Sequence, residues 1–226
     1  MRTTVSLVAC ICGLLLPAAR LHAQVKPTTM EEMRKLHQDS KAYIAMLENP
    51  ARDAEQKPQE VMMALGLKEG ERIADIGAGT GYFSERLAKC VGPRGRVLAI
   101  DIQPEMLSLL TNRMRPLGIT NVTPVFGKVS DPGLQPASVD LALLVDVYHE
   151  FAFPYEMMQH VCEALKPGGR VVLVEYRTED PAVPIKPVHK MSEAQVRREM
   201  AAQPLEWVET NRVLPWQNIF VFKKRG

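Results

Sequence analysis

The fold is decided by the segment Ile73-Ala-Asp75-Ile-Gly77-Ala-Gly79-Thr-Gly81-Tyr-Phe83. An apolar run of strand type leads into three glycines at alternate positions, and a helical pattern begins directly after them. Glycine suits such a bend because it adopts unusual φ values and lets a ligand approach the backbone closely. The alternative interpretation is a plain glycine-rich turn between a strand and a helix.

Outward from this segment, strand-like and helix-like patterns alternate along the chain. This alternation predicts a Rossmann-like α/β domain, in which helices cover both faces of a seven-stranded, mostly parallel sheet. The predicted strands are 72–76, 96–102, 122–126, 139–145, 170–175, 205–213 and 218–222. The predicted helices are 82–90, 104–115, 154–165 and one that starts at Ser192, where Ser192–Gln195 forms a capping-box pattern. Because the last two strands are joined by a short connection, we expect them to pair antiparallel at one edge of the sheet.

The first 23 residues have the pattern of a signal peptide. Arg2 precedes the apolar run Val5–Leu16, and Leu21-His-Ala23 forms a weak cleavage site. The run is shorter than the ~20 residues of a spanning helix, so a signal peptide is favoured over a short anchor. We therefore predict an exported protein, periplasmic if bacterial, or a cytoplasmic one if this leader is a false start.

Two further regions follow the leader. Residues 24–69 are predicted to form an N-terminal helical segment, which includes a short helix over Pro58–Leu65. Residues 70–226 are predicted to form the main domain.

Charge and cysteine content argue against two classes of partner. Lys and Arg number 28 against 26 Asp and Glu, and removal of Arg2 and Arg20 with the leader leaves 26 of each (28 − 2 = 26). A neutral chain without a long basic run gives little support to nucleic acid binding. Outside the leader, Cys90 and Cys162 match no zinc spacing, so we predict no metal site. Buried, unpaired thiols are the expectation for both, and a disulfide remains the alternative in an oxidising compartment.

A carboxylate follows the glycine segment at an informative distance. Asp101 ends the second predicted strand, 22 residues after Gly79 (101 − 79). An acid at this offset on the neighbouring strand accepts hydrogen bonds from ribose hydroxyls in nucleoside-binding sheets, although it could instead cap the next helix. A dinucleotide-binding segment would need Gly or Ala at position 82, where this chain has Tyr82. The pattern therefore favours S-adenosylmethionine (SAM) over NAD.

Three motifs in order, Asp75–Gly81, Asp101–Met106 and Leu165–Gly169, resemble the class I SAM-dependent methyltransferases. The resemblance covers about residues 70–223 and is greatest to the group that contains the ubiquinone and menaquinone biosynthesis enzymes. It implies SAM as cofactor and methyl transfer to an unidentified acceptor, which we expect to be a small molecule. Oligomeric state stays open.

The resemblance also assigns cofactor contacts by position. It implies that the loop residues Gly77, Ala78, Gly79 and Gly81 line the methionine moiety of SAM. Asp75 would orient this loop and attract the ammonium group, Asp101 would hold the ribose, and Ile102 would lie against the adenine. The family often has an acid after a glycine at the end of strand three, where this chain has Gly127-Lys128. We therefore expect backbone groups near Lys128 and Val129 to contact the adenine.

The segment Asp146-Val-Tyr148-His149-Glu150-Phe151 follows the fourth predicted strand, where the family meets the transferred methyl group. Asp146 is predicted to join the cofactor site, and His149, Glu150 and Tyr148 are the candidate catalytic residues. A base helps if the nucleophile is a hydroxyl or an amine. The alternative is that this polar cluster only caps the following loop.

The next candidate segment is Glu175-Tyr176-Arg177 followed by a proline-rich loop, Pro181–Met191, which leaves the fifth predicted strand at the same edge. Its Lys186, His189 and Lys190 could place positive charge over an acidic substrate, and the alternative is an ordinary solvated loop. Two other functions remain open at this point: an NAD-dependent oxidoreductase, and a SAM-binding protein without catalysis. The latter is kept because SAM is made in the cytosol and an exported enzyme would need a supply.

Overall fold

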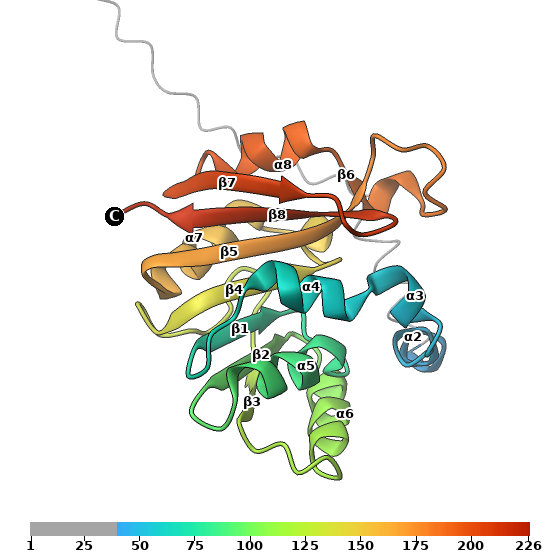
Figure 1. Cartoon of the computed structure of the whole chain (residues 1–226), viewed down its shortest axis with the longest axis vertical. Coiled ribbons are helices and arrows are strands. Elements are labelled where there is room, and N and C mark those ends of the chain that lie inside the picture. Colours follow the sequence, from blue (N-terminus) through green and yellow to red (C-terminus); the bar gives the residue numbers. More distant parts are fainter. Residues whose placement is uncertain (1–39) are drawn as a thin grey trace, which may run out of the picture.

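The computed structural model describes residues 40–226 (Figure 1). The predicted leader and the first part of the N-terminal segment therefore lie outside the described residues. Between Ser40 and Gly226, no helix is both long and apolar enough to span a membrane.

The core of the molecule is one twisted sheet with the strand order β3-β2-β1-β4-β5-β8-β7, and a short β6 pairs with β5 (Figure 1). β1, β2, β3, β4 and β5 are parallel neighbours, and β8 runs antiparallel to both β5 and β7. The predicted parallel sheet with a final antiparallel pair at one edge is confirmed. The strands are β1 (Arg72–Ile76), β2 (Arg96–Asp101), β3 (Val122–Phe126), β4 (Val139–Val145), β5 (Leu165–Arg177), β6 (Lys190–Met191), β7 (Leu205–Asn211) and β8 (Gln217–Lys224).

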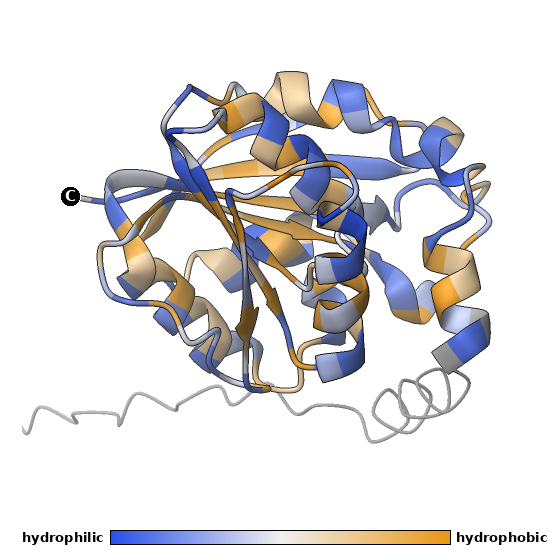
Figure 2. Cartoon of the chain, turned by 90° about the horizontal axis from the view of Figure 1, so that it is seen from below, coloured by the Kyte–Doolittle hydropathy of each residue, from blue (hydrophilic) through white to orange (hydrophobic). Residues whose placement is uncertain are grey.

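Helices cover both faces because the central strands are apolar on both sides. In β4, for example, Leu141 and Leu143 pack with α4 and α5, whereas Ala142 and Leu144 pack with α7 and α8. Figure 2 accordingly shows hydrophobic residues along the central strands and on parts of the helices that flank them. The longer helices are α4 (Pro58–Leu65), α5 (Tyr82–Val91), α6 (Pro104–Met114), α7 (Pro154–Ala164) and α8 (Glu193–Met200).

The described N-terminal segment forms α2 (Ser40–Leu47) and α3 (Arg52–Gln56), followed by α4. The helix predicted over Pro58–Leu65 is confirmed, with Pro58 in its first turn and Gly66 closing it at φ 53°. Ser192 caps α8 as predicted, since its hydroxyl oxygen accepts a hydrogen bond from the Gln195 N–H at 3.1 Å. The α8 capping pattern is therefore a local sequence signal that the fold preserves.

Two expectations need correction. The sequence pattern places the start of β5 at Arg170, but the strand starts at Leu165, because Leu165 pairs with Val139 of β4 before an irregularity in the ladder. The thiols are unpaired as expected, and Cys162 is buried, but Cys90 is exposed because it lies at the end of the solvent face of α5. Within the described residues, Cys90 and Cys162 therefore form no disulfide.

Candidate functional site

A cleft of about 810 Å³ lies where the parallel strands β1, β2 and β4 end, at their carboxyl edge. Pockets for small ligands in proteins commonly have volumes of ~300–1,000 Å³. Tyr43 and Leu47 of α2 and Gln56 of α3 contribute to its wall. The N-terminal helices therefore help to enclose the site that the sheet creates.

The glycine loop after β1 forms one end of the cleft. The N–H groups of Gly77 and Ala78 both donate to the Ile100 carbonyl oxygen at 2.9 Å, which ties the loop to β2. Gly77 has φ 72°, and a Cβ there would lie 2.5 Å from Cγ2 of Val147. The loop thus needs glycine at position 77 for both its conformation and its packing.

Gly81 differs from the rest of the predicted cofactor loop. Gly77, Ala78 and Gly79 line the cleft, whereas Gly81 is absent from the described residues that line it. At φ 85°, Gly81 precedes α5, and a Cβ there would lie 2.9 Å from Leu110 Cγ of α6. The structure therefore gives this glycine a packing role, and its predicted contact with the cofactor stays a prediction.

Asp101 reaches the glycine loop directly. Its Oδ2 accepts a hydrogen bond from the Gly79 N–H at 2.9 Å, and its Oδ1 accepts one from the Gln103 N–H at 2.8 Å. The side chain is mostly buried and lines the cleft. The end of β2 and the loop after β1 are therefore held against each other by one carboxylate.

Asp75 lies beneath the same loop at the end of β1. Burial raises the pKa of its carboxyl to about 6, against the hydrogen bond that Ser84 donates to it at 2.6 Å. The side chain is 3% exposed and also lines the cleft. Its link to Ser84 in α5 is consistent with the predicted orienting role, which remains a prediction.

Ile102, Lys128 and Val129 lie together along the opening of the cleft. Ile102 and Val129 are 44% and 50% exposed, so an apolar surface is open to a flat ligand there. The Lys128 N–H donates to the Asp131 carbonyl oxygen at 2.7 Å and closes a turn. These three residues thus belong to the lining of the cleft, and their contact with adenine stays a prediction.

Asp146 follows β4 with an unusual φ of 50°. Its Oδ2 accepts hydrogen bonds from Gln56 Nε2 at 2.7 Å and from Gln217 Nε2 at 3.2 Å. Burial, followed by the neighbouring charge of Glu175, raises the pKa of Asp146 to about 7. Asp146 therefore joins α3, β4 and β8 at the base of the cleft.

At the other end of the cleft, His149 pairs with a buried glutamate. Glu175 of β5 is fully buried, and its Oε2 lies 2.6 Å from His149 Nδ1 while its Oε1 accepts the Tyr148 N–H at 2.8 Å. Burial alone would lower the pKa of His149, but the charge of Glu175 and the hydrogen bond to it raise this pKa to about 9. The imidazole is consequently fixed in orientation by Glu175, a residue in a candidate segment to which the sequence assigns no role of its own.

Two more polar side chains complete this end. His149 Nε2 lies 3.1 Å from His189 Nδ1 and 3.8 Å from Glu150 Oε1, and all three residues line the cleft. Burial raises the pKa of Glu150. The sequence predicts His149 and Glu150 as catalytic candidates because they follow β4. It indicates His189 only as a possible positive charge in the proline-rich loop.

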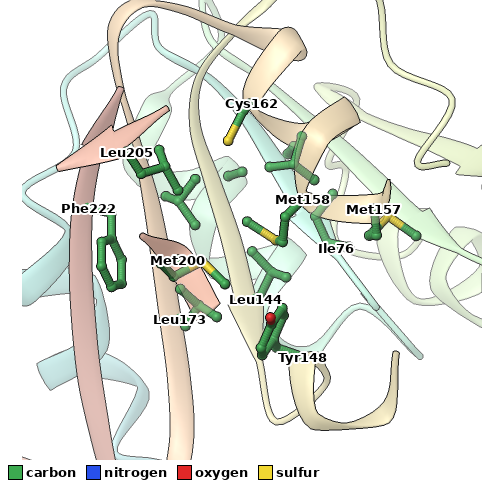
Figure 3. Close-up of a cluster of buried hydrophobic side chains, with 14 of the residues drawn as sticks. Ile76, Leu144, Tyr148, Met157, Met158, Cys162, Leu173, Met200, Leu205 and Phe222 are labelled. Carbon is green, nitrogen blue, oxygen red and sulfur yellow. The ribbon is translucent and has the colours of Figure 1, made fainter. Parts of the chain in front are cut away.

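Tyr148 takes a different direction from its neighbours. Its ring packs in the apolar core with Leu144, Leu173 and Met200, as Figure 3 shows, and it is 4% exposed. Its hydroxyl donates to Glu199 Oε2 of α8 at 2.9 Å. Tyr148 is absent from the described residues that line the cleft, so its position favours a structural role over the predicted catalytic one.

The proline-rich loop contributes Ile185 and His189 to the cleft, with His189 in the short 3₁₀ helix η2 (Pro187–His189). The Lys190 ammonium instead donates to the Val183 carbonyl oxygen at 2.7 Å, within the loop. Among the described residues, neither Lys186 nor Lys190 lines the cleft. The loop therefore presents an imidazole to the cleft in place of the expected lysine charges.

Comparisons with known proteins agree with this geometry. A family model described as a methyltransferase domain matches residues 67–219. A SAM-dependent methyltransferase structure from Aquifex aeolicus superposes with a TM-score of 0.75 at 25% identity, covering 80% of this chain and 97% of that one.

Two curated relatives show how far the similarity extends. The chain is 32% identical over 109 residues to a protein-L-isoaspartate O-methyltransferase of Methanococcus aeolicus, a match that covers 48% of each chain. It is 28% identical over 142 residues to a ubiquinone/menaquinone biosynthesis C-methyltransferase of Pseudomonas syringae pv. tomato, covering 62% of this chain and 52% of that one. The matches thus span about half the length of these relatives.

Proposed function

Because this chain belongs to the class I methyltransferases that use SAM, we propose that it methylates a small-molecule acceptor bound beside His149 and Glu150. The observation that carries the proposal is the shared cleft. The glycine loop and Asp101 lie in the same cavity as the polar cluster of His149, Glu150 and His189. Cofactor and acceptor could therefore meet without crossing bulk water.

The described residues fit the methionine end of SAM. Three buried oxygens of cleft residues, Thr80 Oγ1, Asp146 Oδ1 and Gln56 Oε1, lack a hydrogen-bond partner within the described structure. Buried polar atoms are rarely left unpaired, so such atoms in a cleft favour a ligand that supplies donors. The ammonium group of SAM is such a donor, and we assign it to Asp146 Oδ1 in place of Asp75, the acceptor that the family resemblance implies.

SAM supplies a methyl group on a positively charged sulfur, which is already an activated electrophile. The protein mainly has to align the acceptor atom with that methyl group, and alignment of two reactants is worth several powers of ten in rate. The Gly77–Gly79 loop and Asp101 would fix the cofactor side. His149, held by Glu175, would orient an acceptor hydroxyl or amine, and Glu150 would help to remove its proton.

Enclosure supports a small acceptor over a protein side chain. α2 and α3 extend across the cleft, and polar contacts such as Arg113 Nη1 to Glu48 Oε1 at 2.8 Å tie the end of α2 to α6. A protein chain would need a wider opening than a small planar molecule. The similarity to a protein-L-isoaspartate O-methyltransferase makes a protein acceptor the competing hypothesis that an experiment must test.

The test has two stages. Calorimetry with S-adenosylhomocysteine, run beside NAD, should show binding of the former alone; binding of NAD alone would refute the cofactor assignment at this site. Incubation with methyl-labelled SAM and a cell extract, followed by dialysis and removal of unreacted cationic SAM from the dialysate by ion exchange, should then leave label in the small-molecule fraction. Label retained with macromolecules would point to a protein acceptor, and no label transfer under any condition would favour a SAM-binding protein without catalysis.

We also propose that the chain is exported, with cleavage near Ala23. The support is the apolar run after Arg2 alone. N-terminal sequencing of the protein from its native cells tests this: a start at Met1 would contradict it. Export would require SAM on the far side of the membrane, so the same experiment bears on where the reaction can occur.

A further inference from the structure

We propose that His149, Glu150 and His189 bind one divalent transition-metal ion at the acceptor end of the cleft. The three residues come from η1 (Tyr148–Glu150) and η2, and their ligand atoms all lie within 4.8 Å of one another. The inference rests on the proposed function for its chemical role, but the site itself is argued from its own geometry. Two imidazoles and one carboxylate form a donor set that zinc and other first-row divalent ions use.

The separations match those of ligands that share one ion. Bonds of ~2.0–2.2 Å at angles of about 90–109° place two ligand atoms roughly 2.9–3.4 Å apart. His149 Nε2 and His189 Nδ1 are 3.1 Å apart and already satisfy this condition. Glu150 Oε1 lies 3.8 Å from His149 Nε2, and the three ligand atoms are all within 4.8 Å, so the carboxylate must move closer to the imidazoles to share the ion.

Glu175 supplies the support that a metal-binding imidazole requires. It accepts the Nδ1 proton of His149, so that Nε2 is the nitrogen presented to the cleft. Glu175 is itself fixed by the Tyr148 N–H and is fully buried. Metal-bound histidines almost always donate their second ring N–H to a carboxylate or carbonyl in this way.

The local charge favours a cation in the same place. Glu150 and Glu175 carry carboxylates beside His149, and Asp146 also acts on it electrostatically. These acids are largely removed from water, so their attraction for a positive ion is less screened than at a surface. A proton shared between the two imidazoles is the competing interpretation of the 3.1 Å contact.

Three protein ligands leave at least one coordination position for another molecule, as in catalytic metal sites. That position faces the cleft, where the acceptor would lie. An acceptor hydroxyl bound to the ion would lose its proton to water more readily. Its oxygen would then form a bond to the methyl carbon as the carbon–sulfur bond breaks, the electron pair staying on sulfur to give S-adenosylhomocysteine.

Metal binding can be measured on the full chain after treatment with a chelator. Calorimetry with Zn²⁺ and visible absorption with Co²⁺ should each show one ion per chain. His189→Ala should weaken binding at least tenfold, and Glu175→Gln should weaken it by about 10- to 100-fold. His160→Ala is the matched control, because His160 lies on α7 with Nδ1 3.1 Å from the Ser130 carbonyl oxygen, and it should bind as the wild type does.

Calorimetry with S-adenosylhomocysteine in the same variants separates this proposal from the proposed function. Loss of metal with unchanged S-adenosylhomocysteine binding supports the metal site. No metal binding by the wild type, or equal loss in His160→Ala and His189→Ala, would overturn it whether or not the cofactor binds. If His189→Ala does not fold by circular dichroism, Glu150→Gln replaces it, and unchanged affinity there would likewise count against the site.

Discussion

The two ends of the cleft are built in different ways. The cofactor end, defined here as Gly77, Ala78, Gly79 and Asp101, comes from two neighbouring strands and the loops that follow them. The acceptor end, defined as His149, Glu150, Glu175 and His189, comes from η1, β5 and η2, and its two histidines are 40 positions apart in the sequence. The first is local in sequence and largely backbone, whereas the second depends on side chains brought together by the fold. We therefore expect changes at one end to leave the function of the other largely intact.

His149→Ala should have the largest effect. Loss of the group that orients and activates the acceptor should lower the rate of label transfer from SAM by about 100- to 10,000-fold. Affinity for S-adenosylhomocysteine should stay within about threefold of the wild type, because the imidazole lies at the acceptor end. Transfer assays and calorimetry check the two parts, with His160→Ala as control. A matching loss of cofactor affinity would contradict the division of the cleft.

Asp101→Ala should impair the cofactor end of the cleft and leave the acceptor end unchanged. Asp101 holds the loop through the Gly79 N–H and is the predicted ribose acceptor. Hydrogen bonds to a charged group contribute about 1.5–3 kcal/mol, so S-adenosylhomocysteine should bind roughly 10- to 100-fold more weakly. Zn²⁺ binding by the same variant should be unchanged. Unaltered cofactor affinity would remove Asp101 from the assigned site.

Asp75→Asn should change how stability depends on pH. Burial raises the pKa of the folded Asp75 from 3.8 to about 6, so the folded state holds a proton that the unfolded state has lost between these values. The unfolding free energy of the wild type should therefore fall as pH rises from about 4 to about 6, by about 3 kcal/mol from this residue.

The amide that Asp75→Asn introduces does not titrate, so the variant should lack this contribution. Denaturant unfolding of both proteins at several pH values between about 4 and about 8 measures the difference between them. Parallel curves across this range would show that the buried carboxyl does not control the stability of the cofactor end.

Arg113→Ala should have the smallest effect. Arg113 lies 2.8 Å from Glu48 and 3.1 Å from Glu85, and these partly exposed pairs tie the end of α2 to α5 and α6. Such pairs contribute about 0.2–1 kcal/mol. We expect S-adenosylhomocysteine to dissociate about two- to fivefold faster, as measured by stopped flow, without a change in transfer chemistry. A larger effect would mean that the N-terminal helices control access to the cleft more tightly than these contacts suggest.

Several features of the site could be predicted because their signals are local. A strand, a glycine loop and a helix follow one another within residues 72–91, and an acid at the end of the next strand falls beside them because β2 is the parallel neighbour of β1. The contact of Gly79 with Asp101 confirms that placement. Gly81 shows the limit of such reasoning, because its position in the motif could not reveal that its missing side chain makes room for Leu110.

The sequence by itself determined the class of sheet, the glycine loop and the carboxylate opposite it, since each follows from short-range patterns of backbone and polarity. Only the tertiary structure decided that Tyr148 turns into the core while His149 turns into the cleft, and that Glu175 and His189 meet that imidazole. The physical reason is that side-chain direction and long-range pairing depend on packing between elements distant in sequence. No local pattern records which buried acid or which loop histidine will lie there.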